Sequence, residues 1–203
     1  MGLGQIISFL IVSAVVIAVP GPNILVIVST TLVSGKRRGL QTIVGTTFAM
    51  IIQLAIAALG TTLLLATLSQ GLFWLKWCGV AYLVFLGANS FYAFYTHKKS
   101  ARPSAAASMQ RGFWVALTNP KTILFFSAFL PQFANPGSAY LPQIAILSAC
   151  FLLLAVIMDS CYVLLSAKLK CLLVSKDIDR ISNAVSATLF VGAGGLLALS
   201  NRA

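Results

Sequence analysis

The stretch AVPGPNILVI, residues 18–27, lies inside an apolar run that holds no charged residue before Lys36. Two prolines, Pro20 and Pro22, flank Gly21, and Asn23 follows them directly. A proline inside a helix removes a hydrogen bond and clashes with the preceding turn, which costs about 3 kcal/mol. In lipid, the carbonyl groups that this releases need new partners. The stretch therefore predicts a membrane helix that is broken near its middle.

The composition supports the membrane setting. The chain has 203 residues, of which 59% are hydrophobic and 8% charged, whereas soluble domains carry about 25% charged residues. Six apolar stretches approach or exceed the roughly 20 residues that a helix needs to cross the bilayer. Their length and the lack of period-two alternation exclude a transmembrane barrel. We expect one all-α polytopic domain over residues 1–203, with six transmembrane helices at about 6–33, 40–68, 72–95, 112–133, 140–167 and 183–200.

The basic residues gather in the first, third and fifth joints between these helices. Loops rich in lysine and arginine stay in the cytoplasm, so these joints face inward and both termini face the periplasm. The net charge of +11 is therefore a topology signal and not a sign of nucleic-acid binding. Each half of the chain has three helices and enters the membrane in the opposite sense to the other. This parity permits two inverted three-helix repeats, with the first and fourth helices equivalent.

The fourth helix contains a second interruption, LTNPKTILFF, residues 117–126. It places Asn119 beside Pro120, as Pro22 stands beside Asn23 in the first helix. Paired interruptions at equivalent positions of two repeats are a sequence pointer to a transporter's binding site. The alternative interpretation is that these prolines are packing kinks, since proline and glycine are frequent in membrane helices.

Two charged residues lie well inside predicted helices. At 1.5 Å per residue, Lys121 lies roughly 15 Å from the cytoplasmic edge, counted from Arg111. Asp159 lies roughly 13 Å from the same edge, counted from Lys168. A lysine at this depth must meet an anion, a carbonyl group or a water-filled space. The predicted polar layer comprises Asn23, Asn89, Lys121 and Asp159, with Gln53 just above it.

These two charges allow two interpretations. Lys121 and Asp159 could form a static ion pair that joins two helices. They could instead bind charged groups or protons in a cavity, because burial favours a neutral carboxyl whereas a cationic neighbour favours a carboxylate. One lysine and one aspartate suit a zwitterionic substrate, with the carboxylate near Lys121 and the amine near Asp159.

Other functions have less support. The single histidine, His97, lies in a basic loop, and no cysteines form a C-x-x-C pair, so the sequence predicts no metal site, cofactor or enzyme activity. The main alternative to a zwitterionic substrate is the export of a metal ion or another small solute, although a metal-transport site favours several acids, histidines or thiolates. A membrane enzyme or electron carrier would need a nucleophile–base set or paired intramembrane cysteines, and neither is visible. A channel or a scaffold would not require matched broken helices around a lysine and an acid.

The residues PGPN, SGKRRGLQTIVGTTFA, LKWCGVAYLVFLGANSF and RGFWVALTNPKTILFFSAFLPQF resemble the LysE/RhtB family of bacterial amino-acid exporters. The segments DSCYVLLSAKLK and ISNAVSATLFVGAGGLLALS are similar to the same family. This resemblance implies proton-coupled export of amino acids or close relatives across the inner membrane. The site residues that it implies are Pro20, Gly21, Pro22, Asn23, Asn119, Pro120, Lys121 and Asp159. The direction of transport rests on the resemblance alone, and small residues such as Gly79, Gly192 and Gly195 leave a homo-oligomer open.

Overall fold

The computed structural model describes residues 2–19, 21–59, 77, 80–81, 84–89, 91–92, 95, 104–135, 138–172, 184, 187–188 and 191. All elements within these ranges are helical and none is a strand, which confirms an all-α membrane protein. Half of the predicted third helix, most of the predicted sixth and the end of the predicted second, residues 60–68, fall outside the described residues. Those of their residues that are described, such as 84–89 and 187–188, are helical.

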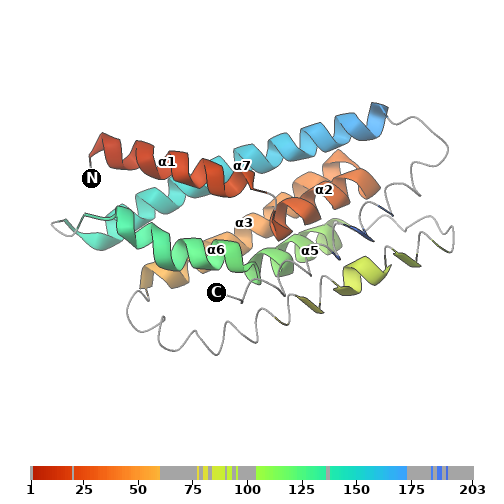
Figure 1. Cartoon of the computed structure of the whole chain (residues 1–203), viewed down its shortest axis with the longest axis horizontal. Helices are drawn as coiled ribbons and strands as arrows, with labels where there is room; N and C mark the ends of the chain where they lie inside the picture. Colours follow the sequence, from red (N-terminus) through yellow and green to blue (C-terminus); the bar gives the residue numbers. More distant parts are fainter. Residues whose placement is uncertain are drawn as a thin grey trace.

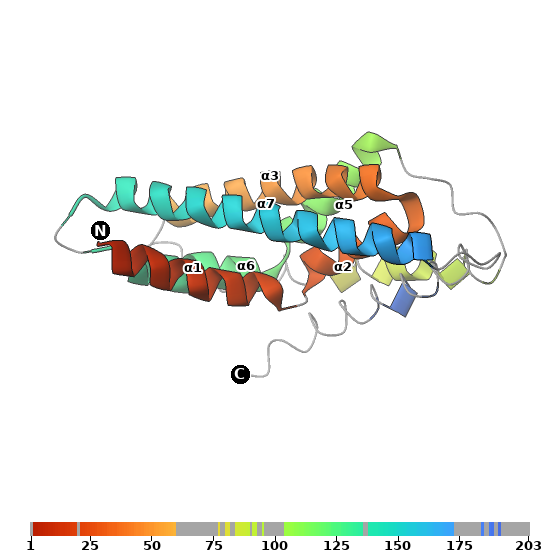
Figure 2. The same cartoon turned by 90° about the horizontal axis from the view of Figure 1, so that it is seen from above.

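The described chain forms a helical bundle in which α1, α2 and α7 run one way and α3, α5 and α6 run the other (Figures 1 and 2). It begins with α1 (Leu3–Ala18), α2 (Pro22–Ser34) and α3 (Lys36–Leu59). It continues with α5 (Ala105–Leu117) and α6 (Pro120–Leu124), which runs on through a π-helical turn (Phe125–Phe129) and a 3₁₀ turn (Leu130–Phe133). The long helix α7 (Tyr140–Leu172) packs against α1, α2 and α3.

The two broken helices predicted from the prolines are present. α1 and α2 together are long and apolar enough to cross a membrane, but they are bent by 54° at their junction. α5 and the stretch from Pro120 to Phe133 form a second pair, bent by 50°. α3 and α7 are each long and apolar enough to cross without a break. The described residues thus hold up to four membrane spans, two straight and two broken.

Two helices, α3 and α5, begin earlier than the sequence predicted, within segments that were expected to be loops. The SGKRRG joint is a one-residue turn, because Gly35 takes a φ of +88° that favours glycine, and Lys36 already starts α3. α5 begins at Ala105, seven residues before the expected start at residue 112. The side chain of Ser104 accepts a hydrogen bond from the Ala107 amide, which caps this helix and lets the alanine-rich segment continue it.

Glycines bring α3 and α5 into backbone contact. A Cβ atom added to Gly45 would overlap the carbonyl oxygen of Met109, and one added to Gly112 would overlap that of Thr42. Small residues of this kind let membrane helices approach closely. Residues 42 and 45 of α3 thus meet residues 109–113 of α5 where the two helices cross.

The buried side chains form two clusters, one on each side of the helix breaks. The first is rich in phenylalanine and is centred on Phe9, Phe125, Phe126 and Phe151. The second is aliphatic and joins α2, α3, α5 and α7 through Val26, Ile27, Ile43, Val115 and Val163. The breaks therefore lie between two packed cores.

Candidate functional site

The break between α1 and α2 is an extended segment. α1 ends at Ala18, Val19 and Gly21 have extended backbone, and Pro22 starts α2. Proline suits the first position of a helix, because its fixed φ fits the helix and its missing N–H would have no helical partner there. Pro20 lies outside the described residues.

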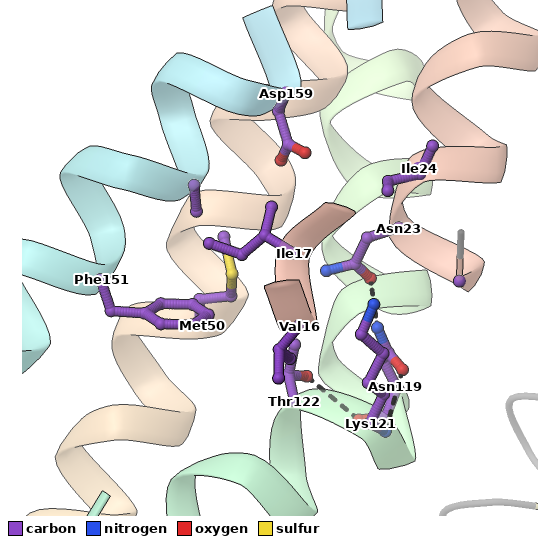
Figure 3. A pocket seen from close by; sticks show the side chains of 12 residues that line it. Val16, Ile17, Asn23, Ile24, Met50, Asn119, Lys121, Thr122, Phe151 and Asp159 are labelled. Atoms are coloured by element: carbon purple, nitrogen blue, oxygen red, sulfur yellow. Dashed lines mark hydrogen bonds between the residues drawn. The ribbon is translucent and has the colours of Figure 1, made fainter. Parts of the chain in front are cut away.

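The break between α5 and α6 has the same plan. α5 ends at Leu117, and Pro120 starts α6 at the position that Pro22 holds in α2. The side chain of Asn119 caps α6, because its Oδ1 accepts a hydrogen bond of 3.1 Å from the Lys121 amide. The same side chain reaches the other break, where its Nδ2 donates to Asn23 Oδ1 at 2.9 Å (Figure 3).

Side chains from other helices satisfy the carbonyl groups that the breaks release. The Lys121 ammonium donates to the Val19 carbonyl at 2.5 Å, and the Tyr162 hydroxyl donates to the Ala18 carbonyl at 3.0 Å. At the other break, Gln53 Nε2 donates to the carbonyls of Ala116, at 3.0 Å, and Leu117, at 3.1 Å. An anion, a carbonyl group or water was expected as the partner of Lys121, and the structure shows a carbonyl group.

A cavity opens beside these breaks, and the space between its atoms is about 370 Å³ when the part that is open to the outside is included. Residues of α1, α2, α3, α5–α6 and α7 contribute to its wall. They are Val16, Ile17, Gly21, Asn23, Ile24, Met50, Asn119, Lys121, Thr122, Phe151, Ala155 and Asp159. Figure 3 shows Asp159 pointing into it from α7.

Lys121 and Asp159 face this cavity together but are not in contact. The Asp159 side chain is only 4% exposed, yet within the described residues no hydrogen bond holds its carboxylate. Nor do the ammonium and the carboxylate approach within the 4.0 Å of an ion pair in this part of the chain. The acid thus has a cavity in front of it and a cation across from it.

The remaining predicted residues are placed as follows. Gln53 is buried, and it caps the end of α5 without lining the cavity. Asn89 lies on the helical stretch 84–89, where it is exposed and does not line the cavity. The sequence predicted a layer of four polar residues, and the structure brings Asn23, Lys121 and Asp159 to one cavity.

Tyr162 and the apolar lining residues were not predicted from the sequence. Tyr162 lies three residues after Asp159, so both are on neighbouring positions of one helix face. Phe151, Ala155 and Asp159 are spaced four apart, which is the signal that would have linked them.

No group of three or more histidine, cysteine or acidic side chains that could hold a metal ion occurs in the ranges described. The cavity wall there carries one acid, one lysine, two asparagines and a threonine, besides apolar residues and Gly21. This set of groups can bind an anion and a cation at two separate points.

Comparison with known proteins gives a consistent picture. The family model described as LysE type translocator matches residues 14–201. A leucine efflux protein of Klebsiella pneumoniae is 30% identical over 137 residues, which cover 65% of this chain and 64% of that protein, a little under two thirds of its length. An uncharacterized membrane protein of Vibrio cholerae is 29% identical over 195 residues, or 95% of each chain. One of Pseudomonas aeruginosa is 30% identical over 145 residues, or 68% of this chain and 67% of that protein. No solved structure matches the chain.

Proposed function

Since the chain belongs to the LysE type translocator family, we propose that it exports amino acids or close derivatives from the bacterial cytoplasm across the inner membrane, driven by the proton gradient. The name of the Klebsiella pneumoniae relative, a leucine efflux protein, supports export and an amino-acid substrate. The observation that carries the proposal is the pair of opposite charges, Lys121 and Asp159, that face one cavity between two broken helices.

The cavity complements a zwitterion. The substrate carboxylate takes the place of the Val19 carbonyl on the Lys121 ammonium, whose long side chain can move between the two. The substrate ammonium binds the Asp159 carboxylate, which has no hydrogen-bond partner among the described residues. A charged group this far into a membrane helix is costly unless it has a partner or water, so both residues gain from binding.

Asp159 also supplies the coupling. Its carboxylate holds either the substrate ammonium or a proton, because a protonated carboxyl no longer attracts a cation. Substrate leaves outward when a proton from the periplasm takes its place, and the proton leaves inward when cytoplasmic substrate returns. This exchange gives one proton entering for each zwitterion that leaves through Asp159.

A metal ion is a poorer substrate for this cavity. Among the described residues that line it, one carboxylate is the single anionic group, and no histidine or cysteine is present. Divalent metals bind several such ligands at once. The lysine in the wall would repel a cation further.

The test compares Lys121→Met, Asp159→Leu and the double variant in proteoliposomes, at matched protein content. Amino-acid transport is measured with and without an imposed pH gradient, and Lys168→Met, an exposed lysine on α7, is the control. We expect each single variant to lose gradient-driven transport at least tenfold, since such charge-assisted contacts contribute roughly 1.5–3 kcal/mol. The double variant should recover membrane abundance, because no lone charge remains, but not gradient-driven transport.

Two outcomes would contradict the proposal. Gradient-driven transport restored in the double variant would mean that the two charges serve the structure only. A wild-type protein that moves no amino acid at all would remove the amino-acid substrate itself.

A further inference from the structure

We infer that the exporter selects neutral amino acids with aliphatic side chains, and that Ala155 sets the size of the side chain it accepts. This inference rests on the proposed function, because it assigns the substrate side chain to the apolar part of the cavity wall, away from Lys121 and Asp159. It starts from the three groups on the α-carbon of an amino acid, which diverge in three directions. The cavity wall has three corresponding parts, namely a cation, an acid and an apolar surface.

The two charged side chains of the wall are both occupied by the α-carboxylate and the α-ammonium of the bound amino acid. Lys121 and Asp159 are the charged side chains among the described residues that line the cavity, and they match the carboxylate and the ammonium. The polar amides of Asn23 and Asn119 already bond to each other, and Asn119 also accepts from the Lys121 amide. No further charge on this described wall can therefore meet a charged substrate side chain.

The apolar part lies on the other side of the cavity. Figure 3 shows Met50 and Phe151 across the cavity from Asn23, Asn119 and Lys121. Met50 and Phe151, together with Ile17 and Ala155, are buried members of the phenylalanine-rich cluster. A charged or strongly polar side chain placed against them would lose its water without gaining a partner, which is costly. An aliphatic side chain gains from the same burial.

Ala155 stands between the acid and the aromatic end of this surface. Phe151, Ala155 and Asp159 follow each other at four-residue intervals on α7, so each step along the helix is about 6 Å. Ala155 is 2% exposed and lines the cavity with a single methyl group, the smallest side chain between two larger lining neighbours. The Phe151 ring meets the edge of Phe126 with centroids 4.8 Å apart, which closes the far end. A substrate bound to Asp159 therefore places its side chain over Ala155.

This geometry makes residue 155 the determinant of size. A leucine at this position fills the space over α7 and leaves room for a small substrate side chain only. A glycine enlarges the space and admits a bulkier one. One methylene group in an apolar pocket changes selectivity by roughly 10- to 200-fold, so the shift is measurable.

The experiment measures initial export rates of alanine, leucine, methionine, phenylalanine, lysine and glutamate in proteoliposomes at matched protein content. It compares the wild type with Ala155→Leu and Ala155→Gly. The matched control is Ala149→Leu, an exposed alanine on the same helix. In the wild type, leucine should exceed lysine and glutamate at least about tenfold. In Ala155→Leu, the alanine-to-leucine ratio should rise about tenfold or more, whereas the control keeps the wild-type ratio.

The glycine variant keeps the inference testable if the leucine variant fails to fold, and its ratio of phenylalanine to leucine should rise. Wild-type export of lysine or glutamate at the rate of leucine would overturn the substrate class and leave the proposed function standing. Unchanged ratios in both variants would overturn the role of Ala155. Absence of export for every amino acid would instead mean that the proposed function fails.

Discussion

The Lys121 ammonium can bond to a carbonyl or to an acid, and in this structure it bonds to the Val19 carbonyl. One side chain thus satisfies one carbonyl group of the first break and keeps a cation at the cavity. The Asp159 carboxylate remains open toward the same space. Loss of Lys121 would affect both the end of α1 and the binding of an anion, so its effects on folding and transport must be measured separately.

Gln53 gives a test of the other break. We expect Gln53→Leu to lower the free energy of unfolding by about 1–3 kcal/mol, because two carbonyl groups at the buried end of α5 lose their side-chain donor. Thermal unfolding of the purified protein in detergent measures this. Gln110→Leu, on the exposed side of α5, should unfold at the wild-type temperature. Equal unfolding temperatures for both variants would mean that water or the backbone replaces the Gln53 amide.

For single residues, the level along the bundle followed from the sequence better than the direction in which a side chain points. Counting residues from the nearest basic side chain gave similar depths for Lys121 and Asp159 and put Asn23 nearer the midplane, and these three share a cavity. The same count included Asn89, which is exposed on its helix. Rise per residue fixes the depth, but a helix that is apolar on all sides carries no pattern that fixes its rotation. Tyr162 and Ala155 were missed for this reason.

At the scale of elements, the contact between α3 and α5 is the closest backbone approach that glycines permit in the described bundle. We expect Gly45→Ala and Gly112→Ala to destabilise the protein by about 1–3 kcal/mol or more, because each added methyl group overlaps a backbone carbonyl that cannot move alone. The measurement is the fraction of protein that stays monodisperse on heating in detergent. Gly4→Ala, where a Cβ would meet nothing, is the control. Wild-type behaviour of both variants would show that the two helices can separate at low cost.

The breaks could be predicted because proline has a strong local effect on a helix. The exact helix starts could not, since they depend on a single cap at Ser104 and a single turn at Gly35. The π-helical turn at Phe125–Phe129 also gave no sequence signal, because its aromatic residues suit an α-helix equally well. Such turns are rare and often lie at functional sites. Here the turn follows the second break and buries the adjacent rings of Phe125 and Phe126.

In the whole molecule, the described basic residues other than Lys121 lie toward one end of the bundle. Lys36, Arg37 and Arg38 start α3, and Lys170 near the end of α7 donates to the Val33 carbonyl at the end of α2. Figure 2 shows that these helix ends lie together, far from the N-terminus. The loop charges predicted this clustering, and we propose that this end of the bundle faces the cytoplasm.

Labelling tests this orientation. We expect Ser138→Cys to react with an impermeant maleimide in intact cells and Arg37→Cys to react only after the cells are broken, because basic ends stay inside. Both positions are exposed, and the background replaces Cys78, Cys150, Cys161 and Cys171 by serine. The reverse pattern would invert the topology.

Each break is completed by the opposite half of the chain, and this has a consequence for synthesis. The hydrogen-bond partner of the Val19 carbonyl is a lysine 102 residues later in the chain, and that of the Ala18 carbonyl is a tyrosine 144 residues later. A chain inserted from its N-terminus therefore carries its first helix in an unfinished state while the next three spans enter the bilayer. Contacts this distant in sequence form late and slow folding. The cavity therefore cannot be completed before α7 has entered the bilayer, and a chain stalled before that point lacks Asp159 and Tyr162.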